Sequence, residues 1–533
     1  MTPMQPTDKP GAAARRSGHE RRGATRVARA SPGTAPRRRI RGSARKKSAS
    51  GTRRILGGPA GDRLVRAPFS PRCNEDVMAV TESSRFAQCD ETARLGLVSS
   101  GTVTSKRSGP LVAATLCGAM VAAYLVLWLG VGAAEIGRSD FTSTYVGATL
   151  LREGQGGSMY DETLQAPLHA ALIAPDREGN LPFVNAPLAA AVALPVSLLS
   201  LQAAYRLWSL LQLALLVGAV VVAIRAAPGR RSLPPLTLVA VGLGALACLG
   251  TLATLLLGQW DGLSALGLAV AYACLRGRRP ATAGAVLAMT ALIAKPHLAL
   301  GLAAFVIGMR DRRLLLGAAG GVVASLLLSL LVASPAGIAG FVGAAIHSTT
   351  RWQLANMVSL VGISGAIAGN GTASHLLAAV GSVVAVAIAA ALGSAARSRP
   401  ARLEAALAGA AVLSLLASPH AYWDDLALLV PALAWSFTAL AARPGGAGRL
   451  GAGVVAAWIA ISVAAFVDIA SDAARPWGVL TPWVLIGAAA LAIATCYREG
   501  ATPPSAIVDG DAPEVGPPAG LAPDVRPLSV HPA

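Results

Sequence analysis

The sequence predicts an all-α polytopic membrane protein with about 12 transmembrane helices. Of its 533 residues, 54% are hydrophobic and 14% are charged, whereas soluble domains carry about a quarter charged residues. From residue 110 onward, long apolar runs alternate with short polar breaks. This alternation is the hydropathy pattern of membrane helices, so an integral membrane protein is expected.

The order of the apolar runs predicts the spans and their orientation. Arginine clusters follow alternate spans, and the positive-inside rule makes their side cytoplasmic. Twelve spans with both termini in the cytoplasm satisfy every cluster. Residues 186–201 are too short and proline-rich for a span, so a re-entrant or interfacial helix is expected there. The expected spans are 111–134, 204–226, 235–257, 259–275, 280–294, 296–309, 314–333, 375–396, 403–418, 425–442, 450–469 and 479–497.

The chain divides into a membrane domain, 108–498, between two tails. Residues 1–107 hold 23 basic and 8 acidic residues, which is 15 of the net charge of +19. Their Arg, Ser, Gly and Pro content predicts a disordered basic cytoplasmic tail, and 499–533 a second disordered cytoplasmic tail. The first tail could touch anionic lipid, or result from a start codon upstream of a true start near Met78. Because only two aromatic residues, Phe69 and Phe86, lie among its many arginines, a nucleic-acid partner is not expected.

Cysteine spacing excludes two further classes of protein. The 6 cysteines are scattered without a C-x-x-C pair, and most lie in or beside apolar runs. Neither a disulfide framework nor a zinc site is therefore indicated.

The connection after the first span carries the most informative polar residue, Asp140. It follows the apolar run 111–134 by a few residues, and Phe141, Tyr145, Val146 and Leu150 then show helical apolar spacing. A carboxylate at the membrane rim, beside an amphipathic segment, suits chemistry on a lipid-borne substrate. The alternative is that Asp140 only caps the following helix.

Other polar segments are expected on the same, outer side of the membrane. They include GQWDGL (258–263), AKPHLAL (294–300), the long loop 334–374 and SPHAYWDD (418–425). A lysine among apolar residues is costly, so Lys295 should line a polar cavity, where it binds phosphate, or else extend to the interface. His420 with Asp424 and Asp425 could suggest a metal, but a metal site needs more converging groups.

Together these segments resemble glycosyltransferase family 87, whose members are membrane enzymes that use polyprenyl-phosphate sugars. The Asp140 segment, the pair Tyr160-Asp161, FVNAPLAAAVALP (183–195), GQWDGL, AKPHLAL, MVSLVG (357–362) and SPHAYWDDLALLVP (418–431) follow the family's order. The sequence departs at Ala186, where a second proline is expected, and at Asp424, where an aromatic residue is expected. The resemblance implies a GT-C-like fold with an extracytoplasmic amphipathic loop after the first span.

The resemblance also implies the chemistry. The expected reaction is inverting transfer of a sugar, with mannose expected, from a polyprenyl-phosphate donor to an extracytoplasmic glycan or glycolipid, without cofactor or metal. Such transfer needs a base for the acceptor hydroxyl and groups that hold the departing phosphate. The expected catalytic base is Asp140. The expected donor-phosphate ligands are Lys295, Arg351 and His420, and the expected substrate-binding residues are Tyr145, Tyr160, Asn185, Gln259, Asp261, His297 and Asp425.

Three other functions remain open at this point. A secondary transporter would also have about twelve spans, but it usually places ionisable residues near the midplane in two similar halves. A lipid-linked glycan polymerase or ligase would share the phosphate chemistry, and a non-catalytic scaffold would need neither Asp140 nor Lys295. The expected location is the plasma membrane, with the active site on the extracytoplasmic face.

Overall fold

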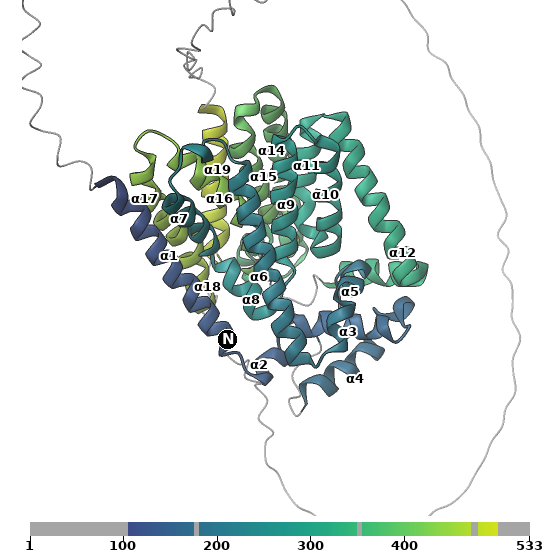
Figure 1. Cartoon of the computed structure of the whole chain (residues 1–533). Coiled ribbons are helices and arrows are strands. Elements are labelled where there is room, and N and C mark those ends of the chain that lie inside the picture. The colour runs from purple at the N-terminus through teal and green to yellow at the C-terminus, as the bar shows by residue number, and fades with distance from the viewer. Residues whose placement is uncertain (1–104, 175–180, 349–353, 471–477, 499–533) are drawn as a thin grey trace, which may run out of the picture. The chain divides into compact units, whose positions relative to one another are not determined.

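The computed structural model describes residues 105–174, 181–348, 354–470 and 478–498, and every regular element in these ranges is a helix (Figure 1). All described residues belong to one compact unit. The predicted tails 1–107 and 499–533 lie outside the described residues, except that α1 begins at Ser105. The all-α, multi-span class predicted from the sequence is confirmed for the described part of the chain.

Eight helical segments of the described ranges are long and apolar enough to cross a membrane, and a ninth is possible if one bent pair forms a single span. The bent pair is α7 (Pro235–Leu246) with α8 (Leu249–Leu257), which meet at 57°. The eight segments lie in α1 (Ser105–Leu129), α6 (Leu201–Ala226), α12 (Arg312–Ser348), α14 (Thr372–Ser398), η6 (Pro400–Arg402) with α15 (Leu403–Ala417), η7 (Asp424–Leu429) with α16 (Val430–Ala441), α17 (Gly446–Trp458) with η8 (Ile459–Val463) and α18 (Ala464–Ala470), and α19 (Thr481–Arg498).

The predicted count of twelve spans is not confirmed, although each predicted segment contains helix. The difference comes from three short helices: α9 (Asp261–Arg276), α10 (Pro280–Ala294) and α11 (Leu300–Met309). Lys295 and Pro296 separate α10 from η4 (Pro296–Ala299) and α11. Proline lacks the backbone N–H that a continuous helix needs, so two short helices form here.

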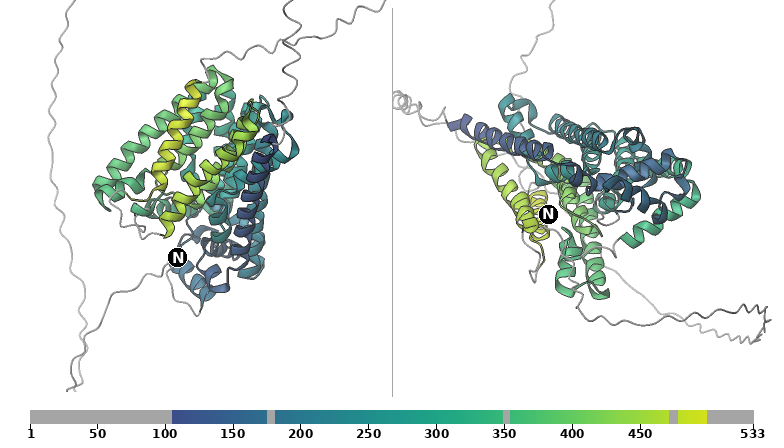
Figure 2. Two further views of the ribbon diagram at one scale, coloured as in Figure 1. Left: turned by 90° about the vertical axis from the view of Figure 1, so that its left-hand side faces the viewer. Right: turned by 90° about the horizontal axis from the view of Figure 1, so that it is seen from below.

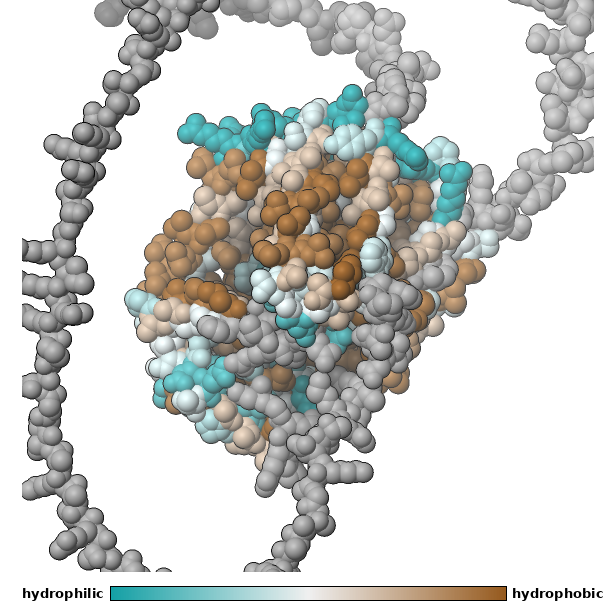
Figure 3. All heavy atoms as spheres, turned by 180° about the vertical axis from the view of Figure 1, so that it is seen from behind, coloured by the Kyte–Doolittle hydropathy of each residue, from teal (hydrophilic) through white to brown (hydrophobic). Residues whose placement is uncertain are grey.

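The surface of the described helices carries an apolar band. Figure 3 shows this band between two hydrophilic rims. Large apolar side chains are exposed along α1, α12 and α14, and include Leu331, with 83% of its surface exposed, and Val383, with 68%. Exposed apolar surface of this extent fits a lipid environment. On the opposite side of the molecule from α12, α1 packs against α7 and α17, which brings the first span beside the C-terminal helices (Figure 2).

The connection after the first span forms a group of short helices at one end of the bundle (Figure 1). The predicted amphipathic helix, α3 (Asp140–Arg152), has all residues from Phe141 to Leu150 buried. It is therefore enclosed by protein over this length, and the expected extracytoplasmic amphipathic loop is not confirmed. The run 186–201 forms short helices, as predicted. The remaining elements of the group are α2 (Ala133–Gly137), η1 (Gly156–Ser158), α4 (Glu162–Ile173), α5 (Pro187–Ala193) and η2 (Leu194–Leu198).

The predicted long loop 334–374 is largely helical. α12 continues to Ser348 after a break at Ser334, whose φ of 59° is left-handed, and Pro335 follows it. η5 (Leu354–Asn356) and α13 (Leu360–Ala368) come next. The sequence marks the break through Pro335, but the helix resumes beyond it.

Close packing of α8 against η7 positions the polar end of the bundle. Gly250 of α8 faces the backbone of η7, and a Cβ atom there would lie 2.2 Å from the nitrogen of Ala427. Only glycine allows this approach. At the end of α8, Gly258 adopts a left-handed φ of 64°, which turns the chain towards α9 and places Gln259 and Asp261.

Candidate functional site

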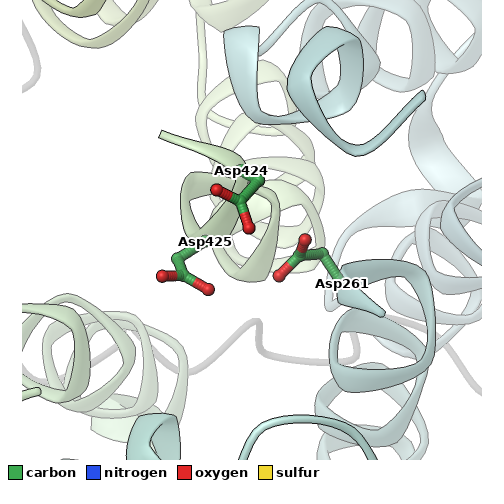
Figure 4. A group of neighbouring side chains, drawn as sticks. All are labelled: Asp261, Asp424 and Asp425. Atoms are coloured by element: carbon green, nitrogen blue, oxygen red, sulfur yellow. The ribbon is translucent and has the colours of Figure 1, made fainter. Parts of the chain in front are cut away.

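A buried lysine surrounded by carboxylates forms the centre of the candidate site. The Lys295 ammonium lies 3.0 Å from Asp261, 2.5 Å from Asp424 and 2.6 Å from Asp425. Its side chain is only 6% exposed. Figure 4 shows the three aspartates from two elements directed towards a common point. The departure from the family pattern at Asp424 therefore supplies one partner of Lys295.

Asp140 and Gln259 form a second polar pair. The Gln259 side-chain nitrogen donates a hydrogen bond of 2.5 Å to Asp140 Oδ2. Asp140 is the first residue of α3, and Ser139 occupies the position before the helix where a capping residue would be. Helix capping, the alternative role for Asp140, thus does not account for its side-chain contact.

Burial and neighbouring charges change the pKa of Asp140. Burial raises the pKa of Asp140 from 3.8 to about 6, and the nearby Asp424 and Asp425 carboxylates contribute to this increase. The Gln259 hydrogen bond and the Lys295 charge lower the pKa of the same group. A carboxyl with a pKa near 6 is a stronger base than an exposed aspartate and is still largely ionised near neutral pH.

Two imidazoles and a phenol adjoin the carboxylates. The His297 and His420 rings are 5.9 Å apart, and the His420 and Tyr422 rings are 5.0 Å apart. Burial lowers the pKa of His420 and raises that of Tyr422, so both groups favour their neutral forms. The Asp424, Asp140 and Asp425 charges also raise the pKa of Tyr422.

Seven residues predicted from the sequence are brought together here, while three others serve mainly as contacts between helices. Tyr145 donates to the Leu199 carbonyl, at 2.7 Å, and Tyr160 to the Asn185 carbonyl, at 2.6 Å. Asn185 donates to Thr144 at 3.4 Å. The substrate-binding roles of these three residues stay predictions. Arg351 lies outside the described residues. The seven that converge are Asp140, Gln259, Asp261, Lys295, His297, His420 and Asp425.

Sequence reasoning missed Tyr422 and the support behind Asp140. Tyr422 lies inside the quoted segment SPHAYWDD, between the histidine and the aspartates, which is the signal that could have found it. Trp260 is buried and donates to Thr144 at 3.2 Å, which ties the start of α9 to α3. No spacing rule in the sequence relates Trp260 to Thr144.

The carboxylate cluster has a donor set that a metal ion could use. Asp261, Asp424 and Asp425 each offer an oxygen within 4.8 Å of the others, and all three are buried. Oxygen ligands suit hard cations such as Mg²⁺. In this structure the Lys295 ammonium contacts all three carboxylates. The cluster therefore already contains a cation supplied by the chain.

Comparison with protein families identifies the region that holds part of this cluster. Residues 183–419 match the family model of glycosyltransferase family 87. The chain carries a glycosyltransferase family 87 region. The match confirms the resemblance expected from the sequence and indicates a membrane glycosyltransferase, which implies a sugar donor and an acceptor. Gln259, Asp261, Lys295 and His297 lie within the family 87 match, whereas Asp140 precedes it and the segment 420–425 follows it. No curated protein and no solved structure matches the chain.

Proposed function

We propose that this family 87 glycosyltransferase transfers a sugar, with mannose the expected sugar, from a polyprenyl-phosphate donor to an extracytoplasmic glycan or glycolipid. The observation that carries the proposal is the position of Asp140. It is a partly buried carboxylate with a pKa of about 6, and it accepts a hydrogen bond from Gln259 beside a cluster of ionised groups. These are the properties of a general base that acts near neutral pH.

In the proposed reaction, Asp140 takes the proton of the acceptor hydroxyl. The hydroxyl oxygen attacks the anomeric carbon of the donor sugar, and the bond from that carbon to the phosphate oxygen breaks. The polyprenyl phosphate leaves with the electron pair of that bond. Attack opposite the leaving group inverts the configuration of the sugar. His420 and Tyr422 offer N–H and O–H donors to the departing phosphate, and Arg351 is proposed from the sequence as its cationic ligand.

Asp261 and Asp425 have a different proposed role, as hydrogen-bond acceptors for sugar hydroxyls. Their oxygens surround Lys295 beside the aromatic wall formed by His297, His420 and Tyr422. Carboxylates accept hydrogen bonds from hydroxyl groups, and charged acceptors make stronger bonds than neutral ones. This arrangement favours a polyhydroxylated substrate over an apolar one.

The test is transfer of label by membranes that contain the protein. Membranes are incubated with radiolabelled polyprenyl-phosphate mannose, or with the corresponding glucose and arabinose donors, and the lipid and glycan products are separated. We expect Asp140→Asn to reduce turnover by about 10²–10⁴-fold, the usual contribution of a positioned base. Normal turnover in this variant with a verified donor would refute the assignment of Asp140.

Asp161 provides a matched control for the same substitution. It is an exposed aspartate that caps α4, and its carboxylate accepts a hydrogen bond from the Thr163 nitrogen at 2.9 Å. Asparagine is also an effective capping residue, so Asp161→Asn should retain full transfer. Movement of intact donor across the membrane without a new glycosidic bond would instead favour a transporter.

A further inference from the structure

Three carboxylates surround the Lys295 ammonium, which donates hydrogen bonds to Asp424 and Asp425 and forms an ion pair with Asp261. A lysine ammonium has three N–H donors, and three carboxylates lie within 3.0 Å of it, those of Asp261, Asp424 and Asp425. The side chain is 6% exposed. A phosphate oxygen that approached this buried ammonium would therefore compete with the carboxylates already in contact with it.

Displacement would also be electrostatically unfavourable. The cluster contains three carboxylates and one ammonium, so its net charge is negative. Like charges repel more strongly inside a protein than in water, since little solvent screens them. A phosphate anion placed against Lys295 would add to this repulsion.

The same ammonium joins three separate interruptions of the helical bundle. Asp261 begins α9, Lys295 separates α10 from η4, and Asp424 and Asp425 begin η7. Each interruption carries another group of the candidate site. Gln259 precedes Asp261, His297 follows Lys295, and Tyr422 donates its backbone N–H to Asp425 at 2.8 Å.

We propose that Lys295 is a positioning residue of the transfer site, a fixed counter-ion that holds Asp261, Asp424 and Asp425 together, and not a ligand of the donor phosphate. The inference rests on the proposed transfer reaction, and it assigns Lys295 a role that the sequence did not suggest. By joining three chain segments, Lys295 fixes Gln259 and Tyr422 relative to Asp140. It also adjusts the base directly, because its charge lowers the pKa of Asp140 while Asp424 and Asp425 raise it.

The test compares Lys295→Met with a double variant that restores the charge balance. Lys295→Met leaves three buried carboxylates without their cation, and removal of one partner from a buried pair is strongly destabilising. We expect kcat to fall by roughly tenfold or more, the thermal unfolding midpoint in detergent to fall, and the KM for the donor to change little. Adding Asp424→Asn removes one carboxylate from the cluster and returns its net charge to the original value, and Asp424 has no proposed contact with the sugar. The double variant should recover much of the lost thermal midpoint and part of kcat.

Two further variants separate positioning from a general structural effect. Lys295→Arg keeps the charge and should retain more activity than Lys295→Met. Arg276→Met removes a cation 3.6 Å from Glu404, at the other end of α9, and should leave the donor KM and the pH profile unchanged. In Lys295→Met, the acidic limb of the profile of kcat/KM against pH should move to higher pH, since the Lys295 charge lowers the pKa of Asp140.

A phosphate ligand would give a different result. Lys295→Met would then raise the donor KM, Asp424→Asn would not rescue it, and the proposal would be overturned. The proposed transfer function can fail separately. If the wild-type protein transfers no sugar, recovery of the thermal midpoint by the double variant still supports the counter-ion role, and its absence refutes that role.

Discussion

Loss of the Gln259 side-chain amide should move the pH dependence of transfer to higher pH. Gln259→Leu removes the 2.5 Å hydrogen bond to Asp140 Oδ2, which stabilises the ionised carboxylate. A hydrogen bond to a charged group contributes about 1.5–3 kcal/mol, and about 1.4 kcal/mol corresponds to one pKa unit. The pKa of Asp140 should therefore rise by about one to two units from its value of about 6.

The direction follows from the role of the base. Asp140 takes a proton only when it is ionised, so kcat/KM should increase with pH through about 6 in the wild-type protein. In Gln259→Leu, the same increase should occur at about pH 7–8, from the hydrogen-bond energy above. At pH values below both midpoints, the variant should be about ten to a hundred times slower, since each pH unit changes the ionised fraction about tenfold.

The assay measures kcat/KM for a labelled donor between about pH 5 and pH 9, with donor and acceptor concentrations verified at each pH. Gln155→Leu is the matched control, because Gln155 is exposed in the connection that follows α3. It should show the wild-type midpoint. An unchanged or lower midpoint in Gln259→Leu, in a variant with normal thermal stability, would refute the coupling between Gln259 and Asp140.

Three other predictions concern metal, stability and topology. A chelator should leave transfer unchanged, because the Lys295 ammonium contacts the three carboxylates that could hold an ion; loss of activity reversed by added Mg²⁺ or Mn²⁺ would contradict this. Asp468→Ala should lower stability by about 1–3 kcal/mol in thermal unfolding, since Asp468 accepts hydrogen bonds of 2.7 and 2.8 Å from the Leu480 and Thr481 nitrogens at the start of α19. Cysteines at the exposed positions Glu153 and Ser232 should be labelled from opposite sides of the membrane; labelling from one side would refute the proposed orientation.

The sequence predicted the helical segments better than the spans they form. Apolar periodicity marks where a helix is favourable, and each of the twelve expected segments contains one. Length and bending depend on tertiary contacts, which periodicity does not encode. Gly250, for example, allows α8 to pack on the η7 backbone, and α8 meets α7 at 57°. Hydropathy averaged along the sequence shows only one continuous apolar run across α7 and α8.

Burial of the helix after Asp140 has a similar explanation. Phe141, Tyr145, Val146 and Leu150 follow the spacing of an amphipathic helix, and the intervening Thr144 is polar. The structure buries Thr144 as well, because its hydroxyl accepts a hydrogen bond from the Trp260 side chain at 3.2 Å. A polar residue can thus face protein where a distant partner satisfies it. Burial of Thr144 therefore depends on its distant hydrogen-bond partner, and the local apolar spacing does not predict it.

The sequence predicted which residues lie together in the candidate site better than it predicted the contacts between them. Polar residues at helix interruptions were expected to lie near one another. In the structure, Gln259 donates a hydrogen bond to Asp140, and the charge of Lys295 lowers the pKa of the same carboxyl. The sequence predicted a lysine free to hold phosphate. It could not show that the Lys295 ammonium donates hydrogen bonds to Asp424 and Asp425, because those residues lie about 130 positions away along the chain.

The balance of charge suggests which part of the reaction this cluster assists. Four carboxylates, those of Asp140, Asp261, Asp424 and Asp425, act on one another beside a single ammonium, and the imidazole of His420 favours its neutral form. In the proposed reaction, the sugar ring gains positive charge in the transition state, while the leaving phosphate gains negative charge. Fixed negative groups stabilise the first of these charges and oppose the second. The cluster is therefore suited to face the sugar and the acceptor hydroxyl, and the phosphate should lie on its far side, next to neutral donors such as His420 and Tyr422. In this arrangement the negative charges that raise the pKa of Asp140 also favour the positive charge on the sugar, so one cluster assists both proton removal and bond cleavage.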